Sequence, residues 1–132
     1  MADHIQPVAV DGLATLYCLR PDAALCDAVM AEAPPASSPL LLAPLDPLIY
    51  DRRLTRDLWG FDYTWEAYTP PAKRKRGHYA LPVLAGTEIV GHVDARADRE
   101  RGRLRVVSRR VRRGHKTAAA VTALAKFLGL RA

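Results

Sequence analysis

The segment Tyr79-Ala-Leu-Pro-Val-Leu-Ala-Gly-Thr-Glu-Ile-Val-Gly-His-Val-Asp94 contains the clearest strand pattern of the chain. It predicts two strands, Tyr79–Leu84 and Glu88–Asp94, joined by the turn Ala85-Gly86-Thr87. Pro82 interrupts the first strand. Because proline has no N–H to donate to a neighbouring strand, its presence predicts an edge strand or a bulge.

The chain beyond this pair continues the sheet and then forms a helix. Asp98–Gly102 is a polar turn, and Leu104–Arg113 is a long basic strand. Thr117–Leu128 is rich in alanine and predicts a helix. Its apolar face is expected to consist of Val121, Leu124, Phe127 and Leu128.

The basic strand has an unusual pattern, because simple alternation puts cations on both of its faces. We expect Arg103, Arg105 and Arg109 to face one side, and Arg110 and Arg112 to face the other. One face should cover a core. Two explanations remain open: a bulge supports the three valines, or the strand projects toward a partner.

The chain before the strand pair predicts a strand, a helix and another strand. Leu40–Ala43 is a short buried strand, and Pro47–Leu58 is a helix with Asp46 as its N-cap. Tyr50, Leu54 and Leu58 should share its apolar face, with Arg52, Arg53 and Arg56 mostly elsewhere. Phe61–Tyr68 mostly alternates apolar and polar residues, which indicates a half-buried strand.

The N-terminal region predicts a hairpin and a helix. Asp11-Gly12 separates the apolar runs Ile5–Val10 and Leu13–Leu19, as in a type I′ turn. Pro21–Glu32 follows as a helix with Asp22 near its N-cap. Ala33–Pro39 is rich in proline and serine and indicates a linker-like loop. The residues before this loop are too few to fold alone, so we expect residues 1–132 to form a single domain.

These elements indicate an α+β fold, with a small antiparallel β-barrel or curled sheet and flanking helices. Apolar residues make up 49% of the 132 residues, as in ordinary globular domains. The longest apolar runs are too short to span a membrane, and Met-Ala-Asp-His does not begin like a secretory signal. Cys18 and Cys26 form neither a disulfide framework nor a metal pattern. We expect a cytoplasmic protein without cofactor or membrane contact.

Positive charge is concentrated in the C-terminal two-thirds of the chain. Residues 1–46 hold one basic and six acidic residues, whereas residues 47–132 hold 19 basic and 8 acidic residues. Such a gradient indicates a surface for an anionic partner. A nucleic acid is the expected partner, because neutralised phosphates supply most non-specific affinity.

Two clusters of cations are the candidate binding residues. One is the run Lys73-Arg-Lys-Arg-Gly-His78, in which the glycine permits close approach of the backbone to a phosphate; a solvated hairpin tip is an equal alternative. The other is the region 96–116, which contains ten cations and two acidic residues, Asp98 and Glu100. The residues expected to bind DNA are Lys73, Arg74, Lys75, Arg76, His78, Arg99, Arg101, Arg103, Arg105, Arg109, Arg110, Arg112 and Arg113.

Aromatic and catalytic candidates are fewer. Trp59, Phe61, Tyr63, Trp65 and Tyr68 suit a core better than a surface on which bases stack. Asp62 and Glu66 flank Thr64 as a possible carboxylate pair, although a solvent-exposed face is the better interpretation. The sequence contains no metal-ligand spacing, no glycine-rich phosphate loop and no nucleophile motif.

Three runs carry a family resemblance. They are Leu41-Leu-Ala-Pro-Leu-Asp-Pro-Leu-Ile-Tyr-Asp-Arg-Arg53, the run from Gly60 to Val83, and Gly91-His-Val-Asp-Ala-Arg-Ala-Asp98. Together they resemble the C-terminal part of the YcaQ/AlkZ-like winged-helix DNA glycosylases, most strongly over residues 40–98. The sequence departs from the family at His78, where an aromatic residue is expected, and in its unusually basic strand.

The resemblance implies a C-terminal β-barrel domain that completes a DNA channel beside tandem winged-helix motifs. It implies hydrolytic release of a damaged base without a metal, by a Gln-based triplet outside this chain. His4-Ile5-Gln6 matches one form of that triplet, but so short a match arises by chance.

We therefore expect a module that binds double-stranded DNA beside winged-helix domains of a parent or partner chain, without activity of its own. The alternatives are a mainly structural or protein-interaction domain, and a hydrolase that uses His4 and Gln6 or Asp62 and Glu66.

Overall fold

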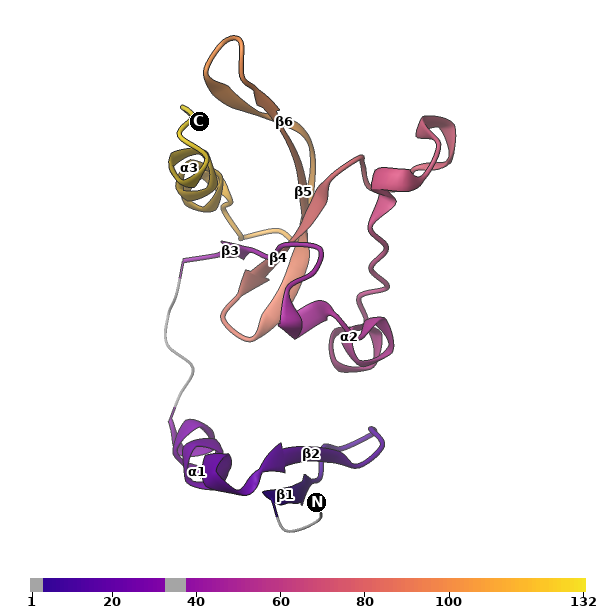
Figure 1. Ribbon diagram of the computed structural model, residues 1–132, viewed down its shortest axis with the longest axis vertical. Helices are drawn as coiled ribbons and strands as arrows, with labels where there is room; N and C mark the ends of the chain where they lie inside the picture. Colours follow the sequence, from indigo (N-terminus) through magenta and orange to yellow (C-terminus); the bar gives the residue numbers. More distant parts are fainter. Residues whose placement is uncertain (1–3, 33–37) are drawn as a thin grey trace. The chain divides into compact units, whose positions relative to one another are not determined.

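The computed structural model describes residues 4–32 and 38–132 (Figure 1). The chain divides into two compact units, Met1–Pro35 and Ala36–Ala132. The predicted linker-like loop Ala33–Pro39 lies mostly outside the described residues.

The first unit consists of a hairpin and a helix. Strands β1 (Ile5–Val8) and β2 (Leu16–Leu19) pair antiparallel, with Ile5 opposite Leu19. The predicted hairpin is confirmed, although its strands are shorter than expected. The type I′ turn is wrong: Gly12 has a φ of 78°, but Asp11 lacks the positive φ that this turn also needs. Helix α1 (Ala23–Ala31) follows and has no buried residue.

The second unit is built on a four-stranded antiparallel sheet in the order β3-β4-β5-β6. The strands are β3 (Leu40–Leu41), β4 (Ala80–Ala85), β5 (Glu88–Asp98) and β6 (Arg103–Val111). Two helices accompany them, α2 (Arg52–Trp59) and α3 (Ala118–Phe127). Within the described chain β3 and β6 are the edges of the sheet. The α+β class and the curled sheet with flanking helices are therefore confirmed, and the sheet does not close into a barrel.

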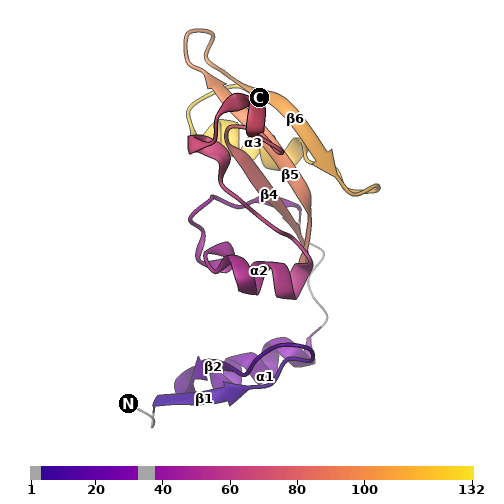
Figure 2. The same ribbon diagram turned by 90° about the vertical axis from the view of Figure 1, so that its right-hand side faces the viewer.

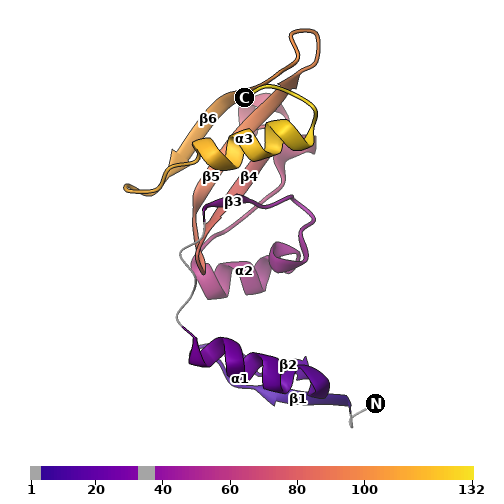
Figure 3. The ribbon, with the colours of Figure 1, turned by 90° about the vertical axis from the view of Figure 1, so that its left-hand side faces the viewer.

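Each face of the sheet carries its own core. On one face α3 lies across the strands (Figure 3), with Val121 and Ala125 in the cluster that contains Val83, Val93 and Leu104. The opposite face is covered by α2 and the segment 60–79 (Figure 2). There a second cluster joins Leu42, Ile49, Tyr63 and Ile89. Burial on both faces explains why β4 is apolar throughout.

A β-bulge interrupts the pairing of β4 with β5 close to Pro82. Val83 pairs with Gly91 but Leu84 pairs with Ile89, so Val90 has no partner on β4. The expected irregularity is confirmed at the residues that follow Pro82. The edge-strand alternative is wrong, because β4 pairs with β3 on one side and β5 on the other.

The predicted helix Pro47–Leu58 is in fact two helices. Asp46 caps a short 3-10 helix, Pro47–Ile49, through the N–H of Leu48. A second cap then begins α2: Asp51 accepts hydrogen bonds from the N–H groups of Arg53 and Leu54. The second aspartate restarts the helix, because it satisfies amides that a continuous helix would bond internally.

The second cap also changes which face of the helix is buried. Thr55 is fully buried and donates its hydroxyl to the carbonyl oxygen of Asp51, whereas Tyr50 is 69% exposed. Arg52 packs its guanidinium 4.5 Å from the ring centre of Tyr63. The predicted face of Tyr50, Leu54 and Leu58 is therefore wrong.

The segment Phe61–Tyr68 keeps the predicted alternation of burial only as far as Trp65, and it is not a strand. Phe61 and Tyr63 stack with ring centres 6.1 Å apart, and the hydroxyl of Tyr63 donates to the carbonyl oxygen of Ala80. The segment has no ladder partner and ends in a 3-10 helix, Glu66–Tyr68. Its side chains are thus ordered by core packing, and the predicted core role of Phe61 and Tyr63 is confirmed.

Helix α3 is one residue shorter at each end than the predicted Thr117–Leu128, with Thr117 at its N-cap, and one residue of its expected face is wrong. Val121 is buried, and Leu124 and Leu128 pack against the same cluster. Phe127 is 86% exposed. Near the end of the helix that carries Phe127, the buried position is occupied by the smaller Ala125, which allows α3 to lie close to the sheet.

Candidate nucleic-acid interface

The cation-rich run 73–78, here called the basic loop, is anchored by a buried carboxylate. Glu66 is 5% exposed. Its oxygens accept hydrogen bonds from the backbone N–H groups of Lys75, Arg76 and Gly77, at 2.9, 2.7 and 3.0 Å. Since the bonds use only the main chain, the cationic side chains remain available to a ligand.

A second buried carboxylate continues this arrangement. Asp94 on β5 accepts hydrogen bonds from the N–H groups of His78 and Tyr79, at 3.2 and 3.1 Å. Gly77 lies between the two sets with a φ of 141°, and a Cβ there would collide with the Asp94 carboxylate. Five consecutive amides are therefore held by two carboxylates, and only glycine fits at the centre.

Glu66 remains ionised because of these bonds. Burial by itself raises the pKa of its carboxyl group, but the three amide hydrogen bonds and the charge of Arg76 outweigh burial and hold the pKa below its usual range. The sequence placed Glu66 with Asp62 on a solvent-exposed face, which is correct only for Asp62. Gly77, directly after four cations, was the only sequence signal of this close packing.

Strand β6 contains a bulge that rearranges its arginines. Asp94 pairs with Ser108 but Ala95 pairs with Val106, so Val107 is unpaired. Because side chains alternate between the two faces of a strand, one extra residue shifts the pattern by one position. Residues before the bulge therefore face the side opposite to the one that simple counting from the residues after it would give. The bulge of the first alternative is therefore present, but of the three valines only Val111 packs against the core, and the simple alternation of the arginines is wrong.

The contacts of β6 identify the two faces. The hydroxyl of Ser108 donates to the carbonyl oxygen of Arg76, so Ser108 faces the basic loop. Arg110, two residues on, follows the same face. Arg109 instead donates to the Thr117 hydroxyl at the start of α3, at 3.4 Å.

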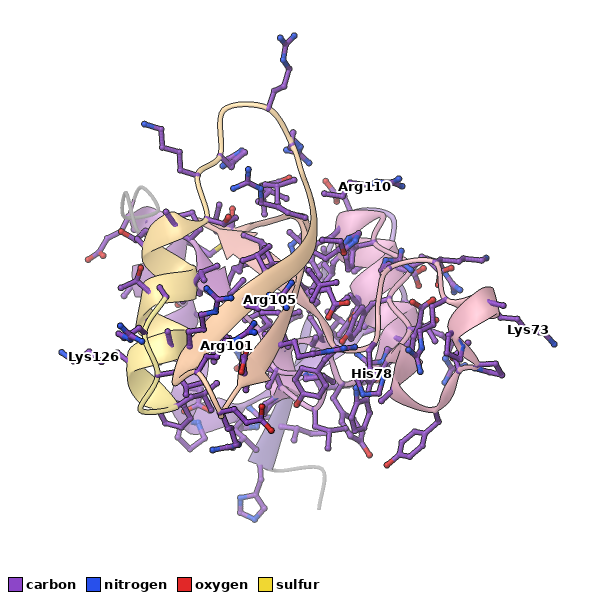
Figure 4. The ribbon with its side chains drawn as sticks, turned by 90° about the horizontal axis from the view of Figure 1, so that it is seen from above. Lys73, His78, Arg101, Arg105, Arg110 and Lys126 are labelled. Carbon is purple, nitrogen blue, oxygen red and sulfur yellow. The ribbon has the colours of Figure 1, made fainter. Side chains whose placement is uncertain are left out.

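Arg105, before the bulge, lies opposite Arg96, and Arg110 lies opposite His92. Since His92 and Arg96 are on the same face of β5, Arg105 shares the face of the basic loop with Arg110. This places Arg103, Arg105, Arg110 and Arg112 together and leaves Arg109 on the α3 face. Figure 4 shows Arg101 and Arg105 on the β5–β6 hairpin, Lys73 and His78 on the segment to one side, and Lys126 on α3 to the other.

The side of the sheet that carries the basic loop, Arg103, Arg105, Arg110 and Arg112 is here called the basic face. It has few counter-charges. Asp98 pairs with Arg101 at 3.7 Å and with Arg103 at 4.0 Å. Arg105 lies directly opposite Arg96 across the strands, and like charges in that position repel. Among the described residues no carboxylate lies within ion-pair distance of Arg105 or Arg110, so the repulsion is not locally relieved.

The two cation clusters meet around one hollow of about 480 Å³. Lys75 and Arg76 line it from the basic loop, and Arg110 and Arg112 line it from the region of β6. His92 and Phe61 also line it, with the guanidinium of Arg76 5.2 Å from the ring centre of Phe61, and Val90, Gly91 and Val111 complete the wall.

The remaining candidate cations do not line this hollow. Lys73 and His78 are exposed on the basic loop, and Arg74 donates to the carbonyl oxygen of Thr69 at 2.8 Å. Arg99 and Arg101 belong to the turn between β5 and β6, and Arg113 belongs to the turn after β6.

An aromatic cluster adjoins the basic loop. The ring of Trp65 packs edge to face against Tyr68 and Tyr79, at 5.6 and 6.0 Å between ring centres. Tyr68 is 88% exposed, so the predicted core role does not hold for it. The cluster presents an exposed ring beside a positive surface, an arrangement on which bases can stack.

The residues considered for catalysis or metal binding are separate. His4 is exposed, Gln6 lies opposite Cys18 in the first unit, and both Glu66 oxygens accept amide hydrogen bonds. Across residues 4–32 and 38–132 no group of three metal-ligating side chains occurs. No helix in these ranges is long and apolar enough to cross a membrane.

Comparison with known proteins places this basic face in context. The family model of DNA glycosylase AlkZ-like proteins matches residues 1–129 of the chain. No solved structure matches the chain. The match covers nearly the whole sequence and includes both basic clusters and the hairpin that precedes them. The chain therefore belongs to the AlkZ-like DNA glycosylase family, and this membership supports a role related to DNA repair.

Proposed function

We propose that this chain is the module of a DNA glycosylase-like repair protein that binds the phosphate backbone of double-stranded DNA near a lesion. The observation that carries the proposal is the basic face itself. Two basic segments that are distant in sequence lie on one side of the sheet, joined by the contact of Ser108 with the basic loop.

The arrangement suits a phosphate backbone better than a compact ligand. Cations extend from Lys73 along the basic loop to Arg110 and down the hairpin to Arg105 and Arg101 (Figure 4). An extended row of Arg and Lys side chains can contact successive phosphates and release their counterions. Bases are not read by such contacts, which position the duplex and leave recognition of the lesion to other groups.

The catalytic step is assigned elsewhere in this proposal. Winged-helix domains of a parent or partner chain supply the groups that activate water, and this chain supplies affinity and orientation. The isolated chain is accordingly expected to release no base from alkylated DNA.

Fluorescence anisotropy with a short labelled duplex at two salt concentrations tests the proposal. We expect measurable binding at low salt and a steep decrease with added salt. Lys75→Ala should weaken binding and flatten its salt dependence, whereas Lys126→Ala, which removes an equal charge from α3, should change neither. Absence of binding at low salt would contradict the proposal and favour a structural domain, as would equal effects of the two variants.

A further inference from the structure

The hollow between the basic loop and β6 has the properties of a discrete anion site. Its cationic lining comes from Lys75, Arg76, Arg110 and Arg112. No carboxylate belongs to its lining. Among the described residues, Arg112 is the one lining cation that forms a side-chain ion pair, with the exposed Glu88 at 3.5 Å, and an exposed pair of this kind contributes little. The buried carboxylate of Glu66 lies behind the wall and bonds to the backbone N–H of Arg76.

The walls of the hollow are held in place without a ligand. Gly91 has a φ of 147°, and a Cβ there would collide with the carbonyl oxygen of Arg110 and with the backbone of Val111. On the opposite side, Glu66 fixes the backbone of Arg76 through a hydrogen bond of 2.7 Å. Both walls are therefore positioned by the backbone, so binding an anion requires ordering of the cationic side chains but little movement of the main chain.

His92 forms part of this wall, and the charges around it affect the pKa of its imidazole. The residue is 7% exposed and lies directly opposite Arg110 across the strands. Burial lowers the pKa of its imidazole, and the charges of Arg76 and Arg110 lower it further, against the opposite effect of Asp94 and Glu66. Both guanidiniums therefore act on one buried ring, with Lys75 and Arg112 lining the same hollow.

We propose that this hollow binds a single phosphate group, and that His92 takes up a proton when the phosphate enters. The proposal rests on the proposed function and selects one contact point within the basic face. Arg76 and Arg110 supply planar forks that suit phosphate oxygens. A bound anion offsets the two charges that disfavour the imidazolium, so proton uptake follows from binding.

Titration with inorganic phosphate, followed by the NMR signals of the His92 ring in the full chain, tests the site. Saturable shifts of these signals are expected. Arg110→Gln should weaken phosphate binding at least about tenfold, the loss expected when one charge-assisted hydrogen bond is removed. Arg105→Gln is the matched control on the same strand and face, and should leave phosphate binding unchanged. Equal losses in the two variants, or an unshifted His92 signal, would overturn the proposal.

The pH dependence of duplex binding tests the role of His92. A duplex without terminal phosphates is used, because its diester groups do not titrate near neutral pH. Affinity should rise more steeply as the pH falls below neutral in the wild type than in His92→Gln, which keeps the exposed His78 of the basic loop. The two should bind alike at alkaline pH. Identical pH profiles would overturn the proton-linked role, and a comparison of thermal unfolding confirms that the variant is folded.

The outcomes separate this site from the broader function. Salt-dependent duplex binding that Arg110→Gln and Arg105→Gln weaken equally would leave the proposed function intact and remove the discrete site. Phosphate binding at His92 without duplex binding would remove the proposed function and retain the site. A 5′-phosphorylated oligonucleotide that then binds more tightly than its unphosphorylated form would assign the site to terminal phosphates.

Discussion

The carboxylate of Glu66 and the backbone N–H of Arg76 are joined by a hydrogen bond of 2.7 Å, so an acidic side chain holds a loop made of cations. Glu66 bonds to the main chain of the loop rather than to its side chains, and the N–H groups of Lys75 and Gly77 donate two further hydrogen bonds to it. The basic loop is consequently ordered without loss of its positive side chains. This combination explains how a highly charged segment remains fixed in position beside β6.

Replacement of Glu66 by glutamine should disorder the basic loop. An amide group cannot accept all three hydrogen bonds, and the cost should be about 3 kcal/mol of unfolding free energy. Chemical denaturation checks this value. Duplex affinity should also fall, because the cations lose their fixed positions. The neighbouring Asp62→Asn change removes an exposed carboxylate and should alter stability little.

The stability of the wild type should also depend on pH through Glu66. The pKa of Glu66 is lower in the folded protein than the ordinary value of 4.5. Its contribution to stability is therefore complete above the unfolded pKa and is lost as the pH falls through the folded pKa. Melting temperatures measured below pH 5 should decrease more steeply for the wild type than for Glu66→Gln. Parallel curves would contradict this assignment.

Gly77→Ala should destabilise the protein more than Gly114→Ala. Both glycines have positive φ, at 141° and 90°. In both variants, backbone strain should lower the free energy of unfolding by between about 1 and 3 kcal/mol. Only at Gly77 would the new Cβ collide with the carboxylate of Asp94, because the space around Gly114 is open. Thermal unfolding of the two variants gives the comparison. A larger loss for Gly114→Ala would show that the packing against Asp94 is unimportant.

Arg105 and Arg109 lie on one strand but should differ in their effect on DNA binding. Arg105→Ala should reduce the slope of log affinity against log salt by roughly 0.9, the value for one phosphate contact. Arg109→Ala should leave the slope unchanged, because Arg109 contacts Thr117 on the face of α3. Anisotropy titrations at several salt concentrations measure both slopes. A reduction by Arg109→Ala alone would mean that duplex DNA approaches the other face.

Tyr63 should remain protonated at high pH. Burial raises the pKa of its hydroxyl to about 12, against the opposing effect of Arg52. Because the unfolded pKa is near 10, its contribution to stability is complete below pH 10 and is lost as the pH rises toward 12. Ultraviolet titration should show one tyrosine ionising last, and Tyr63→Phe should remove that step. The lost hydrogen bond to Ala80 should cost about 1 kcal/mol.

Much of the fold followed from local patterns in the sequence. The apolar run of β4, the turn that joins it to β5, the Asp11-Gly12 turn and the alanine-rich α3 are short-range features that each segment expresses by itself. The concentration of cations after residue 47 likewise required no structure, because charge is a property of composition. These features were sufficient to predict an α+β sheet and a basic surface.

Local patterns failed wherever a distant residue decided the outcome. Phe61–Tyr68 alternates like a strand, yet it pairs with nothing because the core on that face takes up its rings. Glu66 looked like a surface residue, because its amide partners lie nine to eleven positions further along the chain.

The sequence by itself determined most of the strands and helices and that a positive surface results. The tertiary structure alone decided which arginines share that surface, because the bulge at Val107 reverses their alternation through the pairing of β6 with β5. It also brought Arg76 and Arg110 to the same hollow, through carboxylates and backbone contacts that connect segments distant in the chain. Strand register and burial depend on partners, and no local pattern contains that information.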